Sequence, residues 1–298
     1  AIRDNFDAAQ RGVKKIFSEL TKPKDGVSLS SANSINIGRL VPQIVYYFAA
    51  YKQLVESGEI KPGTKISFTV PTGNFGDIMA GWFAKSMGLP IGRLICASNK
   101  NDVLTEFFKT GHYDKRREFY RTTSPSMDIL VSSNLERLLY YVCGAEKTGK
   151  YMENLELKGE YQIDLSELEK IQQTFVGISS SDEEGARAIR DIFDKNNYLI
   201  DTHTGIAEAS YRKLIAAGTE PNIPNVILAT ASPFKFPRSV LRALGEEASE
   251  SDAENLNRLS EVSKLPVPAQ LAEIFFKGVK SGDIIYSEEM KDYVIREL

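Results

Sequence analysis

The feature that most constrains the fold is a β-forming run that leads through a glycine-containing loop into a helical segment. Residues 65–70 have the composition of a strand, and residues 78–87 have helical spacing. Gly73 and Gly76 lie in the loop between them. A strand, a glycine loop and a helix in this order direct free backbone N–H groups and the positive end of a helix dipole at one point, which suits a phosphate group.

The loop, residues 70–77, leaves two interpretations open. Its glycines let a ligand approach the backbone closely, but their spacing matches neither the dinucleotide-binding nor the P-loop fingerprint. An ordinary connection between a strand and a helix has the same appearance. Asp77 begins the following helix, and its carboxylate would repel a bound dianion. We therefore expect Asp77 to cap backbone N–H groups or to contact a non-phosphate part of a ligand.

Other strand-like runs alternate with helical segments along the chain. Residues 93–97 and 225–229 read as buried strands. This alternation predicts an α/β fold with a mostly parallel, twisted sheet flanked by helices. The charged, tyrosine-rich section 112–161 breaks the rhythm and reads as an insertion, and residues 246–254 read as a solvated loop. Capping boxes at Ser166 and Ser181 open two of the expected helices, and Pro42 should kink another. We expect helices at about 7–20, 36–57, 103–109, 135–142, 166–175, 182–193, 206–214 and 287–298, and one that follows residue 237 and ends at 244.

Composition excludes several functional classes. A net charge of −3 argues against nucleic acid as the main partner. Cys96 and Cys143 are far apart in apolar surroundings, which predicts buried thiols in a reducing compartment and not a disulfide framework. The presence of only His112 and His203 argues against a histidine-based metal site. Without a long apolar run or a signal peptide, we expect no membrane partner and a cytoplasmic location.

Three further places carry candidate chemistry, each with a simpler structural explanation. Ser34 and Arg39 flank a predicted helix start and could hold a second anion, although N-capping beside a surface arginine also fits. Thr230 follows the last predicted strand, where open α/β sheets bind ligands, but a strand-end threonine can be structural. His203 stands beside Asp201 and could act as a base, or could cap a helix within the core.

Several of these segments occur together and in order in one enzyme family. Their combination resembles threonine synthase, a pyridoxal-phosphate enzyme of fold type II, the tryptophan synthase β-like fold. The matching segments are residues 31–39, 70–77, 98–105, 124–128, 201–204 and 229–237. The likeness is collinear over nearly the whole chain. It is specific as a set, although each piece alone is weak.

The resemblance implies a reaction and a role for each matching residue. The cofactor implied is pyridoxal 5'-phosphate, with its phosphate in the loop formed by Gly73, Asn74, Phe75, Gly76 and Asp77 and its pyridine nitrogen facing Thr230. Ser34 and Arg39 would bind the phosphate of O-phospho-L-homoserine. The family's reaction releases that phosphate and adds water, giving L-threonine. The implied domains are a remnant of the smaller domain at residues 1–30 and a large cofactor-binding domain at 31–298.

One departure from the family pattern concerns the catalytic lysine. The family's Schiff-base lysine lies in an upstream Phe-Lys-Asp context that does not occur here, and Lys235 falls on a different, C-terminal motif. We therefore expect the chain to be the C-terminal part of the enzyme, inactive alone. Two alternatives stay open: a threonine synthase-like phospho-lyase acting on another phosphorylated amine, and a non-catalytic fragment serving as a binding module. Gly205 and Ser232 also differ from residues common in the family, and the oligomeric state stays open.

Overall fold

The sheet predicted from the sequence is present and parallel. The computed structural model describes residues 1–4, 6–20, 26–219, 223–277 and 282–297. Strands β1 (Ile66–Pro71), β2 (Ile91–Ser98), β5 (Phe175–Ser179) and β6 (Asn225–Ile227) form a sheet in the order β5-β2-β1-β6. Every pairing in this sheet is parallel. The carboxyl ends of the strands therefore meet at one edge, where ligands of open α/β sheets bind.

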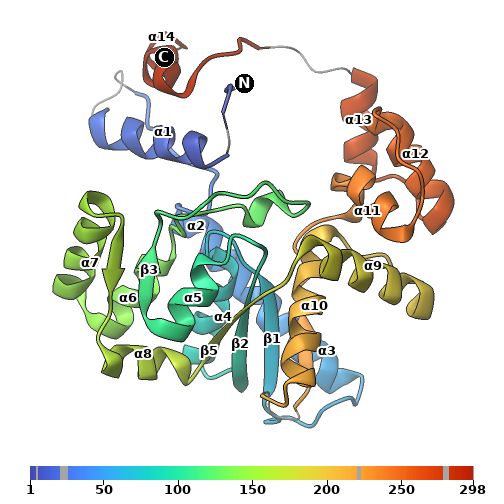
Figure 1. Cartoon of the computed structure of the whole chain (residues 1–298), viewed down its shortest axis with the longest axis horizontal. Helices are drawn as coiled ribbons and strands as arrows, with labels where there is room; N and C mark the ends of the chain where they lie inside the picture. The colour runs from blue at the N-terminus through green and yellow to red at the C-terminus, as the bar shows by residue number, and fades with distance from the viewer. Residues whose placement is uncertain (5, 21–25, 220–222, 278–281, 298) are drawn as a thin grey trace.

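The apolar pattern of the sequence explains why this sheet is buried. All six residues of β1 are buried, and β2 is buried over its second half. Such continuous burial is typical of parallel strands covered on both faces. Helix α10 (Thr202–Ala216) crosses the sheet and contacts all its strands, while α4 (Gly76–Ser86) and α5 (Val103–Thr110) also pack on it (Figure 1).

The remaining helices surround this centre. Helix α3 (Ile44–Glu56) packs against α4, and α9 (Asp182–Asn196) packs against α10 and α11 (Pro237–Leu244). A second hydrophobic cluster forms where α9, α11 and α12 (Asp252–Ser263) meet, away from the main core. The other helices are α2 (Ile37–Leu40), α6 (Leu135–Cys143), α7 (Ala145–Leu157), α8 (Leu165–Gln172) and α13 (Ala269–Lys277).

The two ends of the chain lie side by side. Helix α1 (Phe6–Glu19) contacts α14 (Met290–Glu297) at a distance from the sheet, and Ile2 forms a parallel bridge with Ile285 (Figure 1). The salt bridge between Lys291 and Glu19 joins the same two helices. The predicted terminal helix is confirmed from Met290, after a short 3-10 turn at residues 287–289. Leu298, its predicted last residue, lies outside the described residues.

Several predicted boundaries are wrong. The helix expected at 166–175 ends at Gln172, its cap is Asp164 and not Ser166, and Phe175 begins strand β5. Strand β6 ends at Ile227, two residues earlier than predicted. Helix α12 begins inside the expected loop 246–254. The section 112–161 also contains β3 (His112–Asp114) and β4 (Glu160–Gln162), an unforeseen antiparallel pair.

Two local predictions are confirmed. A 3-10 turn at residues 41–43, which contains Pro42, separates α2 from α3, because proline cannot donate the hydrogen bond that a continuous helix requires. Ser181 caps α9 in a reciprocal box with Glu184. Both features depend on neighbours in the sequence and not on tertiary contacts.

Candidate functional site

The glycine loop presents a series of backbone amides without partners. Strand β1 ends at Pro71, and α4 begins at Gly76. Among the described residues, no protein acceptor bonds the backbone N–H groups of residues 73 to 77, although the carbonyls of Gly73 and Asn74 accept bonds from Ser132 and Asn134. Buried amides normally have partners. Free amides at the N-terminus of a helix are therefore a ready site for an anion.

The shape of the loop depends on Phe75 as well as on its glycines. Phe75 caps α4 in the left-handed conformation, with a φ of 64°. This conformation costs a residue with a side chain about 1–2 kcal/mol. The Phe75 ring is buried against Phe108 and Phe175, with centroids 5.9 and 5.6 Å away. Packing against α5 and β5 thus holds the loop in this conformation.

Gly73 is required by a close approach of the backbone. A Cβ atom at this position would lie 2.2 Å from the carbonyl oxygen of Ser126. Gly76 is less restricted, because a Cβ there would meet its nearest atom, Ser34 Cβ, at 3.4 Å. The segment around Ser126 therefore lies directly against the loop and forms a wall of the site.

A cavity of about 720 Å³ opens over the loop. This volume lies within the usual range of small-molecule sites. Its lining brings together parts of the chain that are far apart in the sequence. They are the segment predicted to bind a second anion (Asn33, Ser34, Arg39), Gln43, the loop itself, Pro125 to Met127, His203, and the segment after β6 (Thr230, Ala231, Lys235, Phe236).

The two groups predicted to bind a second anion both line this cavity. Ser34 is half-buried and donates to Asn33 Oδ1 at 3.1 Å. Arg39 is exposed, and its Nη1 donates to the carbonyl of Ala32 at 2.6 Å. The cap of α2 is Asn36, whose side chain accepts from Gly38 N–H, so neither Ser34 nor Arg39 serves as that cap. Gln43, not foreseen from the sequence, has a buried Oε1 that accepts no hydrogen bond from the described residues.

Asp77 behaves differently from the capping role expected of it. Its side chain accepts a hydrogen bond from the hydroxyl of buried Tyr47 at 3.3 Å, and the same hydroxyl donates to the Asp77 carbonyl at 2.8 Å. No backbone N–H of the described residues donates to the carboxylate. Burial raises the pKa of Asp77 to about 6, against the smaller opposing effect of the Tyr47 hydrogen bond. A partly protonated carboxyl repels a bound anion less than a carboxylate does.

Thr230 lies where the sequence placed it relative to the loop. Strands β1 and β6 are neighbours, so Thr230 and the glycine loop lie at adjacent strand ends and line the same cavity. Thr230 is exposed and makes no side-chain hydrogen bond to the described residues. Ser232 instead caps a 3-10 turn by accepting from Phe234 N–H. Lys235 also lines the cavity, with its Nζ 5.2 Å from the centroid of the Phe236 ring.

The wall around Ser126 is held by residues to which the sequence gave no role. Asn99 follows β2, and its side chain donates to Asp128 Oδ1 at 2.7 Å and to Ser124 Oγ at 3.0 Å. Asp128 also accepts from Thr122 N–H at 2.9 Å. These bonds join two of the segments on which the family resemblance rests, residues 98–105 and 124–128. Only that resemblance signalled them, because they are far apart in the sequence.

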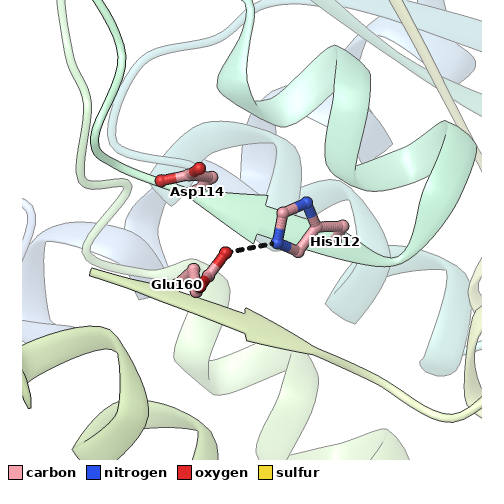
Figure 2. Close-up of side chains that lie close together, drawn as sticks. All are labelled: His112, Asp114 and Glu160. Carbon is pink, nitrogen blue, oxygen red and sulfur yellow. Dashed lines mark hydrogen bonds and ion pairs between the residues drawn. The ribbon is translucent and has the colours of Figure 1, made fainter. Parts of the chain in front are cut away.

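A separate cluster lies on the β3–β4 pair. His112, Asp114 and Glu160 bring possible metal ligand atoms within 4.8 Å of one another, and His112 Nε2 lies 3.0 Å from Glu160 (Figure 2). The sequence did not foresee this grouping. Arg116 binds Asp114 through two hydrogen bonds of 2.9 Å and also pairs with Glu160. The chain thus supplies its own cation to these carboxylates.

Neither cysteine has the features of a reactive thiol. Cys96 is buried in β2, and its burial raises the pKa of the thiol to about 12. Cys143 is half-buried, and desolvation followed by the nearby charge of Glu167 raises its pKa to about 12 as well. At such pKa values the thiolate is scarcely populated at neutral pH.

Comparison with solved structures identifies the class of protein that has this fold. A threonine synthase from Brucella melitensis, described as bound to pyridoxal phosphate, superposes with a TM-score of 0.78 at 37% identity, covering 99% of this chain and 58% of that one. Threonine synthase from yeast gives 0.78 at 32% identity, covering 100% of this chain and 58% of that one. The fold is therefore that of the fold type II pyridoxal-phosphate enzymes.

Sequence comparison narrows the class to a family. Residues 204–278 match the family described as "Threonine synthase, C-terminal". Human "Threonine synthase-like 1" is 41% identical over 89% of this chain and 36% of its own length. Threonine synthase of Saccharomyces cerevisiae is 35% identical over 89% of this chain and 54% of its own length, and that of Pseudomonas aeruginosa is 38% identical over 82% and 50%. The chain belongs to the threonine synthase family.

Two further findings concern the length of the chain and its helices. The chain spans about a third to a half of the length of these curated relatives. In the part of the chain that the structure describes, no helix combines the length and the apolar character that crossing a bilayer requires.

Proposed function

We propose that this chain is the cofactor- and substrate-binding part of a threonine synthase, which converts O-phospho-L-homoserine and water into L-threonine and phosphate. One observation carries the proposal. A single cavity brings together the unpartnered amides of residues 73–77, a strand-end hydroxyl, and a serine and an arginine suited to a second phosphate. Two phosphate-binding groups in one cavity are what a phosphorylated cofactor and a phosphorylated substrate require together.

The residues of the cavity fit pyridoxal phosphate. The free amides of the glycine loop match the oxygens of a phosphate ester, and the dipole of α4 favours its negative charge. Thr230, whose hydroxyl is free of other described partners, would face the pyridine nitrogen. A neutral hydroxyl leaves that nitrogen largely unprotonated, whereas a carboxylate would favour its protonation.

The bound cofactor would supply an electron sink for carbanions next to the amino group of the substrate. The chain itself would bind and orient. Among the described residues, one N–H donor of Arg39 bonds Ala32 and the others have no partner, so the guanidinium can bind a phosphate through two parallel bonds. Ser34, half-buried beside it, adds a donor. Together they would hold the leaving phosphate near the cofactor site.

The lysine that joins the cofactor belongs, in this proposal, to a part of the protein outside this chain. Lys235 lines the cavity but stands on the segment after β6, in a Phe-Lys-Phe context. Borohydride reduction of the full-length holoprotein, followed by peptide mass spectrometry, tests this assignment. We expect no label on any lysine of residues 1–298 and an unchanged yield of reduced adduct in Lys235→Arg. A reduced adduct on Lys235 would overturn the assignment.

A second candidate function differs from the first in its substrate. The chain is 41% identical to a relative named "Threonine synthase-like 1", compared with 35% and 38% for two threonine synthases, so its substrate can differ from that of the synthases. We keep as the second candidate a phospho-lyase acting on another phosphorylated amine. Incubation of the full-length holoenzyme with O-phospho-L-homoserine distinguishes the two. Equimolar L-threonine and phosphate support the synthase. Phosphate released with a keto acid, or no release from this substrate, supports the phospho-lyase.

The place of the protein in the cell and its domain division remain predictions. We propose that it acts in the cytoplasm in threonine biosynthesis. We also propose that residues 1–30 belong to a smaller domain than residues 31–298. Fractionation of cells that express the full-length protein checks the first proposal. Limited proteolysis with mass mapping checks the second, which requires preferred cleavage near residue 30.

A further inference from the structure

His203 lies at the wall of the cavity but belongs to neither of the two proposed phosphate sites. It stands in the first turn of α10 and is only 2% exposed. Asp201, the cap of that helix, accepts from His203 N–H and lies 2.8 Å from the ring Nδ1. The hydroxyl of Thr204 also donates to Asp201. Burial alone would raise the pKa of Asp201, but these hydrogen bonds outweigh it and hold the pKa below its usual value.

The partner of the other ring nitrogen fixes the tautomer. The backbone N–H of Ser126 lies 3.1 Å from His203 Nε2. A backbone amide can only donate, so Nε2 must be an unprotonated acceptor. The proton of the neutral ring is therefore on Nδ1, where it is donated to the carboxylate of Asp201. A chain of hydrogen bonds thus connects the buried carboxylate of Asp201, the oriented imidazole of His203 and the backbone of Ser126.

Ser126 connects this chain of bonds to the glycine loop. While its N–H bonds His203, its carbonyl oxygen comes so close to Gly73 that a Cβ there would lie at 2.2 Å. Asn99 and Asp128 hold the same segment from its other side. His203 therefore fixes the face of the Ser126 segment that meets the loop.

We propose that His203 is a positioning residue, held by Asp201 as the Nδ1–H tautomer, that fixes Ser126 against Gly73 and thereby sets the affinity of the glycine loop for the phosphate of pyridoxal phosphate. The inference rests on the proposed function for the identity of the ligand. The hydrogen bonds among Asp201, His203 and Ser126 do not depend on the proposed function.

Two substitutions separate this role from a merely structural one. In His203→Gln the terminal amide oxygen can replace Nε2 as the acceptor for Ser126 N–H. In His203→Asn the shorter side chain can replace Nδ1 as the donor to Asp201, but it leaves Ser126 without an acceptor. Ser126→Pro removes the N–H itself at an exposed position, and it keeps the proposal testable if His203→Asn fails to fold. The same two changes at His112, which lies on the β3–β4 pair, serve as matched controls.

The dissociation constant for pyridoxal phosphate is measured by equilibrium dialysis with each full-length protein, and exchange of the Ser126 amide is followed by hydrogen–deuterium mass spectrometry without cofactor. Loss of one partly exposed hydrogen bond predicts an affinity about fivefold weaker in His203→Asn and Ser126→Pro, with a deprotected amide in the former. His203→Gln and both His112 variants should stay within about twofold of the parent protein.

Three results would overturn the positioning role. They are equal affinities of the Gln and Asn variants at position 203, full affinity of Ser126→Pro, and an unprotected Ser126 amide in the parent protein. Another result would contradict the proposed function, and the positioning role would then be decided by the exchange of the Ser126 amide. That result is a parent protein which binds no pyridoxal phosphate, or binds it without competition from inorganic phosphate.

Discussion

Gly73→Ala is the sharpest test of the loop geometry. The added methyl would lie 2.2 Å from the carbonyl oxygen of Ser126 and 3.3 Å from its carbonyl carbon. Both contacts are to backbone, which cannot rotate away as a side chain can. To restore an ordinary contact distance, loop and wall must separate by about 1 Å. A displacement of that size at a binding site can weaken function about 100-fold, and overpacking typically costs about 1–3 kcal/mol of stability.

The matched control is Gly76→Ala in the same loop. Its methyl would meet Ser34 Cβ at 3.4 Å and Asn134 Nδ2 at 3.5 Å, which are ordinary contacts. Neither Gly73 nor Gly76 has a positive φ, so backbone strain does not separate the two changes. Urea unfolding monitored by circular dichroism gives the stability of both variants, and cofactor fluorescence gives their affinity for pyridoxal phosphate. Equal losses in the two variants, or parental affinity in Gly73→Ala, would refute the reasoning.

Two further predictions concern the residues on either side of Gly76. Phe75→Gly removes about 1–2 kcal/mol of left-handed strain but also a buried ring worth about 3–5 kcal/mol. Urea unfolding should therefore show a net loss of about 2 kcal/mol, and a gain in stability would contradict the packing argument. The pKa of Asp77 is raised from 3.8 to about 6, so this carboxyl ionises at a higher pH in the folded than in the unfolded chain. Its contribution to the free energy of unfolding therefore falls as pH rises from about 4 to 6 and stays low above pH 6. Asp77→Asn should remove this part of the pH dependence, which is worth at most about 3 kcal/mol, and should stabilise the protein at pH 8. The free energy of unfolding is measured against pH for both proteins, and an unchanged profile in the variant would contradict the raised pKa.

The local part of this fold could be predicted because its signals are short-range. Strand β1, the glycine loop and α4 follow one another within a few residues, and the capping box at Ser181 spans only four. Strand β5 was missed for the opposite reason. Its residues continue directly from α8 without a glycine or proline between them, and a short buried strand lacks the alternation that would distinguish it from a helix. Only pairing with β2 decides its conformation.

The sequence pattern indicates only that parallel strands end at one edge of the sheet, whereas the other contacts of the site depend on tertiary structure. Thr230 and the glycine loop share a cavity because adjacent parallel strands end at one edge, which the α/β pattern implies. The contact between Ser126 and His203 joins positions 77 residues apart through a backbone amide. Backbone groups carry no residue-specific signal. Sequence patterns therefore cannot indicate such a bond. The expected capping role of His203 also belongs to its neighbour, because Asp201 caps α10 and accepts from His203 N–H.

The left-handed Phe75 explains why the loop can keep its amides free before any ligand binds. A glycine there would reach the same conformation without strain but would also leave it easily, because glycine populates many others. With phenylalanine, the conformation persists only while the ring stays packed against Phe108 of α5 and Phe175 of β5. Those two rings are themselves stacked, with centroids 5.4 Å apart. The geometry of the anion site is thus fixed by the hydrophobic core beneath it, so the site needs little reorganisation when a phosphate arrives.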